Sequence, residues 1–356
     1  MSYRAWSLIC VSSFLLAVVF GGTRMEGAWV RLQEVEPQRL VGFTKSEVHM
    51  GVRFQISLYT TDEARAEQAF AASFAEIARL EQVFSDYKSE SEARRIDLAT
   101  CDVAIEVSPD MQRVLSHSLA IHHATNGYFD VTLGSLTKLW RTARREKRPP
   151  APAALATAGQ RVGSHLLDLQ ERHLVKRSPG VELDFGGIAK GDAADQALKL
   201  LQQKFGITRV LVDASGDLVA GDPPPNQVGW VIELERPADD PGPRTRVSLA
   251  NQALASSGDS VQFLETDQAR WSHLLNPHTK TPIVGQNLTL VWADTGATAD
   301  ALASALAICT TQEFASITAR FPGLVASVYR RTSSDQPTEV LQTENWHEWI
   351  REKRIE

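Results

Sequence analysis

The sequence is poor in cysteine. Its 356 residues include three, Cys10, Cys101 and Cys309, and none stands in a CxxC pair or at metal-ligand spacing from a histidine. This pattern excludes a zinc module and a redox dithiol. A Cys101–Cys309 disulfide would depend on a geometry that the sequence does not supply, so we expect two unpaired, partly buried thiols.

An excess of positive charge is also missing. Lys and Arg number 37 against 43 Asp and Glu, for a formal net charge of -6. The chain therefore lacks the basic footprint of a nucleic-acid-binding protein. Apolar residues make up 43%, enough to form a core, and 22 glycines and 16 prolines are ordinary numbers. Composition indicates a globular protein of enzyme size and no particular chemistry.

No apolar run is long enough to span a bilayer comfortably. Arg4 precedes an apolar segment from Ala5 to Phe20, about 16 residues against the roughly 20 that a spanning helix needs, and Gly21-Gly22 follow. A positive start, a short apolar stretch and small residues are typical of a secretory signal. We predict a signal peptide or membrane anchor over residues 1–22 and a lead-in over 23–44. The chain would then be exported to the periplasmic side, with the N-terminal segment as its link to the inner membrane if it is not cleaved.

The remaining chain mixes helix and strand patterns without a regular alternation, which predicts an α+β class. A strand is predicted from Val48 to Tyr59, with Gly51 near its start, and a capping box at Thr60 and Glu63 would begin the next helix. The apolar face of that helix is Phe70, Phe74, Ile77, Leu80 and Phe84. Further helices are predicted over 108–125, 189–204 and 299–308, and strands over 181–185, 210–213, 230–235 and 324–329.

A basic, proline-rich stretch runs from Arg141 to Pro152. Runs of like charge between periodic segments are usually solvated loops. We therefore predict a solvated loop here in preference to a binding patch.

The segment from Leu183 to Gly191 suits a phosphate. It passes from a predicted strand through Gly186-Gly187 into a helix, so backbone N–H groups and the positive helix end face one point, and Lys190 adds a cation. The segment matches neither a P-loop nor a dinucleotide fingerprint, and an ordinary strand-to-helix turn is the simpler interpretation.

A second candidate site is the pair Asp300 and Ser304. Four residues apart, they share one face of an apolar helix and could hold a hard cation such as Mg²⁺. An N-terminal Asp favoured by the helix dipole, with a Ser packed between helices, is the structural alternative. His273, a lone histidine in the segment 271–277, is by itself more typical of packing than of catalysis.

Taken in order, these segments resemble the FAD:protein FMN transferase family, also called ApbE-like. The stretches that carry the resemblance are His49-Met50-Gly51, Phe84-Ser85-Asp86-Tyr87 with Ser91-Glu92, Gly127-Tyr128-Phe129-Asp130-Val131-Thr132, Asp184 to Gly191, Ser215-Gly216-Asp217, Ser257-Gly258-Asp259, Ser272 to Pro277, and the Asp300 helix. The resemblance covers roughly residues 45–330. It implies one large mixed α/β domain of the ApbE-like (T-fold-like) type with an FAD cleft, followed by a tail over 331–356.

The resemblance also implies an activity. Members pass FMN from FAD to a Thr hydroxyl of a target protein, with a divalent metal at the pyrophosphate and AMP leaving. The target would be a redox-driven membrane complex or an exported flavoprotein, with no nucleic acid involved. The positions implied for FAD are Met50, Tyr87, Tyr128, Phe129, Asp130, Asp184, Lys190 and Leu274. Those implied for Mg²⁺ are the carbonyl of Gly187 and the side chains of Asp300 and Ser304; His273 or Asp300 would take the proton of the acceptor hydroxyl.

The chain departs from the family pattern at a few positions. Ser304 replaces a Thr, Asn276 an Asp and Lys280 a Gly, while Ser215-Gly216 stands where a glycine pair is usual. Two other functions stay open: an FAD pyrophosphatase that uses water as nucleophile, and a flavin-binding protein without transfer. The segment 294–298 resembles a flavin acceptor site at Thr298, but we expect it to form the loop entering the metal helix.

Overall fold

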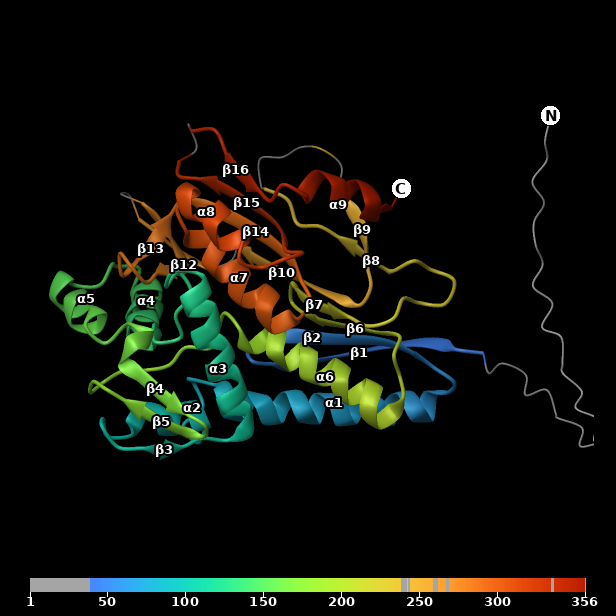
Figure 1. The fold of residues 1–356 in the computed structure, drawn as a ribbon, viewed down its shortest axis with the longest axis horizontal. Helices are drawn as coiled ribbons and strands as arrows, with labels where there is room; N and C mark the ends of the chain where they lie inside the picture. Colours follow the sequence, from blue (N-terminus) through green and yellow to red (C-terminus); the bar gives the residue numbers. More distant parts are fainter. Residues whose placement is uncertain are drawn as a thin grey trace, which may run out of the picture. The chain divides into compact units, whose positions relative to one another are not determined.

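The computed structural model describes residues 39–355, apart from 238–241, 243, 259–261, 267–268 and 334–335. The predicted N-terminal signal or anchor, and Asp259 of one motif, lie outside the described residues. An eight-stranded antiparallel sheet is the centre of the fold, in the order β1-β2-β6-β7-β10-β14-β15-β16 (Figure 1). Its strands are β1 (Val41–His49), β2 (Val52–Thr60), β6 (Val210–Ala214), β7 (Asp217–Ala220), β10 (Gln252–Gly258), β14 (Gln286–Ala293), β15 (Val325–Arg331) and β16 (Glu339–Gln342).

The first two strands form a hairpin; the strand predicted from Val48 to Tyr59 is confirmed from Val52 onward as β2, but the prediction missed the turn that separates it from β1. Met50 and Gly51 take φ values of 50° and 76°, the left-handed backbone of a two-residue turn. On β2 the side chains of Phe54, Ile56 and Leu58 alternate into the core and are fully buried. The turn therefore lies where the sequence suggested the interior of a strand.

Three helices cover one face of the sheet: α1 (Glu63–Phe84), α6 (Ala189–Phe205) and α7 (Gly296–Ile308) (Figure 1). The predicted apolar face of α1 is confirmed, because all five of its named residues are buried. The capping box predicted at Thr60 and Glu63 is not confirmed, because Asp62 is the N-cap and its Oδ1 accepts from the Arg65 N–H at 2.9 Å. Gly206 ends α6 at φ 63°, as predicted. The helix α7 begins three residues before the predicted start.

The other face of the sheet is covered by a second, smaller sheet and by the C-terminal helix. A small sheet of β8 (Trp230–Glu233), β9 (Arg246–Leu249) and β17 (Arg354–Ile355) and the helix α9 (Trp346–Lys353) lie there. The rings of Trp346 and Trp349 lie 5.5 and 4.4 Å from that of Trp292, which β14 buries at the centre of this second core. Leu324 to Tyr329 was predicted as the last strand, but β16 and β17 follow it. The described residues after Arg331 thus complete the fold as two strands and a helix.

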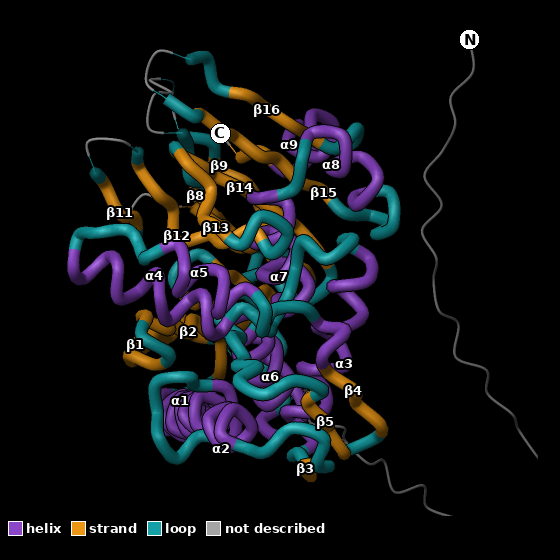
Figure 2. The backbone as a smooth tube through the Cα atoms, turned by 90° about the vertical axis from the view of Figure 1, so that its left-hand side faces the viewer, coloured by secondary structure: helices purple, strands orange, loops and turns teal. Residues whose placement is uncertain are grey.

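The remaining elements lie at one end of the sheet (Figures 1 and 2). They are α2 (Glu92–Leu98), β3 (Ile105–Glu106), α3 (Pro109–Ala124), α4 (Gly134–Glu146), α5 (Pro152–Gly159), a short 3-10 helix (Ser164–Leu166), β4 (Leu167–Gln170), β5 (His173–Lys176), β11 (Phe263–Glu265), β12 (Arg270–Asn276), β13 (Thr281–Val284) and α8 (Thr311–Thr318). The run from Arg141 was predicted as a loop, but its first half is the last part of α4. Cys101 and Cys309 are free, as expected. Among the described residues, no helix is long and apolar enough to cross a membrane.

Candidate active site

The candidate site begins at the turn that leads into α6. Residues 181–185 were predicted as a strand but have no regular secondary structure. Asp184 is held from both sides: its N–H donates to the Val131 carbonyl at 2.7 Å, and its Oδ1 accepts from the Gly186 N–H at 2.9 Å. The turn is thereby fixed so that Gly186 and Gly187 stand immediately before the N-terminal end of α6.

The first turns of α6 and α7 are pressed together through two glycines. A Cβ on Gly191 would lie 2.1 Å from the carbonyl oxygen of Gly296, and a Cβ on Gly296 would lie 2.6 Å from that of Gly191. Because backbone meets backbone, both positions require glycine. From α6, Asp195 accepts the Gly296 and Ala297 N–H groups at 2.7 and 2.9 Å and so caps α7. This contact brings the chemistry-bearing residues of the two helices together.

At this crossing Lys190 joins two buried carboxylates. Its Nζ lies 2.7 Å from Asp217 Oδ2 and 3.2 Å from Asp300 Oδ2, which also accepts the Gly191 N–H at 3.2 Å. Burial and the charge of Asp300 raise the pKa of Asp217 to about 7, although Lys190 opposes the shift. Burial disfavours the charged form of Lys190, but the two carboxylates prevail and raise the pKa of its ammonium. The lysine therefore stays charged.

Asp217 is a site residue that the sequence prediction missed. Its motif, Ser215-Gly216-Asp217, entered the resemblance, but the chain offered no reason to give that Asp a role. It becomes part of the site because it begins β7 and is 3% exposed, facing Lys190 from the sheet.

The three residues implied for the metal share one wall. A Cβ on Gly187 would lie 2.7 Å from Ser304 Oγ and 3.5 Å from the Phe129 ring, so the Gly187 backbone lies directly against the Ser304 side chain. Ser304 and Asp300 are one turn apart on α7. The Ser304 hydroxyl makes no hydrogen bond with any residue in the described part of the chain. A carbonyl, a hydroxyl and a carboxylate thus stand close together.

A second group surrounds Tyr87, which follows α1. The Arg141 guanidinium lies 4.3 Å from the centre of the Tyr87 ring and donates to the Asp86 carboxylate. Asp184 acts electrostatically on this group: after burial, its charge is the main cause that raises the pKa of Asp86, and Arg141 opposes both. Tyr87 thus has one ring face against Arg141, and 76% of the residue is exposed.

Met50, in the β1–β2 turn, lies on the same side of α1. Its N–H donates to Glu81 Oε1 at 2.8 Å, and Glu81 also pairs with Lys88, one residue beyond Tyr87. A non-glycine residue at positive φ is uncommon and costs free energy, so this glutamate bond fixes the turn in place. The Met50 side chain packs against the main core.

The loop 126–130 reaches this wall through Phe129, whose ring would lie 3.5 Å from a Cβ on Gly187. Asp130 is 6% exposed and accepts from Thr132 (N–H 2.8 Å, hydroxyl 2.6 Å) and from Ser164 (N–H and hydroxyl, both 3.0 Å). Its Oδ2 also lies 3.4 Å from His122 Nδ1. Asp130 therefore orders the loop from inside, while the Tyr128 ring meets that of His278 edge-on at 4.6 Å.

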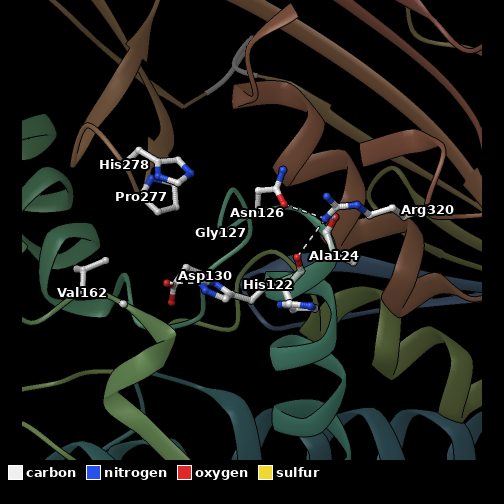
Figure 3. Close-up of a pocket in the computed structure, with 11 residues that line it drawn as sticks. His122, Ala124, Asn126, Gly127, Asp130, Val162, Pro277, His278 and Arg320 are labelled. Atoms are coloured by element: carbon white, nitrogen blue, oxygen red, sulfur yellow. Dashed lines mark hydrogen bonds and ion pairs between the residues drawn. The ribbon is translucent and has the colours of Figure 1, made fainter. Parts of the chain in front are cut away.

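A cavity of about 580 Å³ opens along this loop (Figure 3). Arg320 closes one side by donating to the Ala124 carbonyl at 2.9 Å and to Asn126 Oδ1 at 2.8 Å, while His278 and Pro277 form the opposite side. Its lining residues are His122, His123, Ala124, Asn126, Gly127, Asp130, Val162, Gly163, Pro277, His278 and Arg320. The cavity extends from the loop 126–130 to the 277–278 turn.

His273 and Leu274 lie on β12. Leu274 packs against Ala307 and Ile308 at the C-terminal end of α7, in a cluster that Tyr128 joins. His273 is half-buried, and its Nδ1 lies 3.3 Å from the Gln262 carbonyl. The two predicted residues therefore approach from the hairpin side, whereas Asp300 and Ser304 lie on α7.

The backbone explains the departures from the family pattern. Lys280 and Ser215 adopt φ values of 62° and 55°, in the left-handed region that favours the glycines usual there. Asn276 Oδ1 accepts the His278 and Thr279 N–H groups at 2.9 and 3.3 Å. An aspartate oxygen could accept the same bonds, so the turn after β12 does not need a carboxylate.

Fold and site together define an α/β protein with an antiparallel central sheet, in which two helices in contact bring a small, charged centre together. A sequence profile of the ApbE family matches residues 50–328. The chain therefore belongs to the ApbE family.

Relatives and solved structures agree with this assignment. FAD:protein FMN transferase from Klebsiella pneumoniae (strain 342) is 29% identical over 66% of this chain and 69% of its own length. The transferase of the same name from Haemophilus influenzae is 31% identical over 62% and 67%. The flavin transferase ApbE of Vibrio cholerae has the same fold, with a TM-score of 0.77 at 22% identity over 87% of this chain and 99% of that structure. The family is thus one of enzymes.

Proposed function

We propose that this protein is an FAD:protein FMN transferase that moves FMN from FAD to a Thr hydroxyl of a target protein, with Mg²⁺ as cofactor and AMP as the leaving group. The observation that carries the proposal is the contact of Gly187 with Ser304, one helical turn from Asp300 and beside the Lys190 ammonium. This contact places donors for a hard cation and a positive charge at the same helix start. A pyrophosphate needs both.

The residues present fit Mg²⁺. The Gly187 carbonyl, the Asp300 carboxylate and the Ser304 hydroxyl are oxygen donors, and Mg²⁺ is usually held by few protein ligands together with phosphate oxygens and water. A side chain at position 187 would fill the space against Ser304. When bound, the ion would withdraw charge from the pyrophosphate oxygens and make the phosphorus a better electrophile.

Lys190 and the turn before α6 would hold the phosphates. The Lys190 side chain is 23% exposed, so its ammonium can meet a ligand while Asp217 and Asp300 keep it charged. The start of α6 supplies a positive helix end in the same place. These groups are local, which agrees with a chain of net charge -6 that binds an anionic substrate.

The two ends of FAD would extend to either side of this centre. Met50, Tyr87 and Asp184 would face the flavin, and the exposed side of the Tyr87 ring offers a stacking surface. Tyr128, Phe129, Asp130 and Leu274 would shape the adenosine side next to the cavity. Asp130 would act there by ordering its loop, because its oxygens already accept four hydrogen bonds.

His273 is the better candidate for the base that takes the acceptor proton. Both oxygens of Asp300 lie within 3.3 Å of Lys190 Nζ, and one also accepts the Gly191 N–H. The oxygens of Asp300 are therefore already engaged within the protein, and the same carboxylate is the charged ligand proposed for the metal. His273 is half-buried on β12, and an imidazole is the side chain most often used as a general base. Export to the periplasmic side, with a target protein there, is part of the same proposal.

The decisive experiment measures AMP and target mass after incubation with FAD and Mg²⁺, with and without candidate target proteins. We expect AMP mainly when a target is present, together with a target that has gained FMN. If the same amount of AMP forms without a target, the protein is an FAD pyrophosphatase. If FAD binds but no AMP forms, it is a flavin-binding protein without transfer.

Two variants test the metal wall. Asp300→Ala and Ser304→Ala should lower metal-dependent turnover, the first by about 100-fold or more because it removes the charged ligand. Asp294→Ala is the matched control, since this exposed aspartate lies just before the same helix. If Asp300→Ala and Asp294→Ala behave alike, the metal site is misplaced.

A further inference from the structure

The C-terminal end of α4 carries a concentration of positive charge. Between Arg141 and Arg148 the chain has five basic residues and one acidic residue, although its net charge is -6. The helix ends at Glu146, and Lys147 turns the chain out with φ 53°. We call Arg144, Arg145, Lys147 and Arg148 the α4 basic end.

Little of this charge is neutralised within the protein. Arg144 and Lys147 form no ion pair with any residue in the described ranges, and Arg145 donates to the Thr142 hydroxyl at 3.1 Å. Arg148 meets Glu146 at 3.4 Å, but its side chain is 78% exposed, so water screens the pair. Burial and the like charge of Arg141 lower the pKa of Arg144. The α4 basic end therefore presents positive charge to solvent.

This surface adjoins the candidate site. Arg141, about one helical turn before Arg144 on α4, lies 4.3 Å from the centre of the exposed Tyr87 ring and donates to Asp86. Figure 2 shows α4 between the β11–β12 hairpin, which carries His273, and the layer of β1 and α1. A protein that covers the Tyr87 ring would therefore also meet the α4 basic end.

We propose that the α4 basic end docks an acidic segment of the acceptor protein. The nature of the occupant rests on the proposed function, because transfer requires the acceptor to bring its hydroxyl to the phosphate and so to approach the rim of the site. The chain as a whole carries a net charge of -6, whereas the α4 basic end is positive, so an acidic segment is attracted to this surface. The charge pattern would thus select both the partner and its orientation.

The test uses the full chain loaded with FAD and measures the binding of a fluorescently labelled peptide that contains one threonine flanked by glutamates. A matched peptide has glutamines in place of the glutamates. We expect the acidic peptide to bind more tightly, and to weaken as salt rises from about 50 to about 300 mM. The exposed double variant Arg145→Glu/Lys147→Glu should weaken it about 10-fold.

The matched control is Lys199→Glu/Lys204→Glu, the same charge change on the exposed side of α6. It should change peptide affinity less than about twofold, and FAD affinity should stay the same in all variants. Equal peptide affinity in the wild type and the α4 variant, or an equal loss in the α6 control, would overturn the proposal. A third outcome would also overturn it: the α4 variant binds anionic phospholipid vesicles more weakly than the wild type but binds the peptide equally well. The surface would then serve a membrane.

These outcomes are separable from the proposed function. Peptide binding requires no transfer. If the wild type binds the acidic peptide as expected but never flavinylates a target, the transferase function is refuted and the docking surface stands. If the wild type and the α4 variant flavinylate targets with the same KM, the docking surface is refuted and the transferase function stands.

Discussion

The glycine at the α6–α7 crossing offers the sharpest test of how this site is built. An alanine at position 191 would place its Cβ 2.1 Å from the Gly296 carbonyl oxygen, where ordinary contact begins at 3.4 Å. The clash is with backbone, so no side chain can rotate away, and one helix must shift by about 1.3 Å. That movement would break the 3.2 Å bond from Gly191 N–H to Asp300 and separate Lys190 from the same carboxylate.

Two opposing contributions set the size of the effect. Overpacking a tight contact costs typically 1–3 kcal/mol, and a backbone clash belongs at the upper end, about 3 kcal/mol. Alanine regains about 1 kcal/mol because it favours helix over glycine. We therefore expect Gly191→Ala to lower the free energy of unfolding by about 2 kcal/mol.

Urea unfolding of the metal-free protein, followed by circular dichroism, measures this change. The control is Gly42→Ala, whose Cβ would meet the Tyr59 ring at 3.0 Å, a side chain that can move aside. It should cost less than about 1 kcal/mol. If Gly191→Ala unfolds within about 0.5 kcal/mol of the wild type, the helices are not held by a backbone contact and the account of the site fails.

Three further predictions concern groups around the site. Burial, opposed by the α7 N–H groups, raises the pKa of Asp195 from 3.8 to about 6, so folding favours its protonated form. The free energy of unfolding should therefore fall by about 3 kcal/mol as pH rises from about 4 to about 6. Urea titrations of Asp195→Asn should lack that part of the fall. Arg141→Ala leaves the half-buried Asp86 carboxylate unpaired and raises its pKa further, so the variant should lose about 3 kcal/mol at pH 8 and less at pH 5, while adding Asp86→Asn should restore stability at pH 8. Trp346→Ala should cost about 3 kcal/mol by opening the core around Trp292; thermal melting like that of the wild type would mean that α9 is not part of the folded unit.

Local patterns in the sequence were sufficient for several elements. The apolar face of α1 follows from residues three and four apart, and the left-handed Gly206 ends α6 because glycine has no Cβ to clash there. The pair Asp300 and Ser304 could be placed on one helical face from its spacing alone. These features depend on neighbours along the chain, so the chain itself encodes them.

Features that depend on contacts across the chain needed the tertiary structure. The Met50–Gly51 turn looked like strand interior, because a methionine at positive φ has no sequence signal and is held by Glu81 from α1. The basic run from Arg141 looked like a loop, yet Asp86 and Tyr87 contact its first arginine and its first half belongs to α4.

The sequence by itself determined the family, the order of the motifs and the identity of most groups that could meet FAD and a metal. Only the tertiary structure decided that Lys190 stands between Asp217 and Asp300, residues separated by 27 and 110 positions from it. That grouping arises because Gly191 and Gly296 let two helices touch backbone to backbone, and the sheet sets β7 beneath them. Charge and oxygen donors are properties of residues, but their convergence on one point is a property of packing.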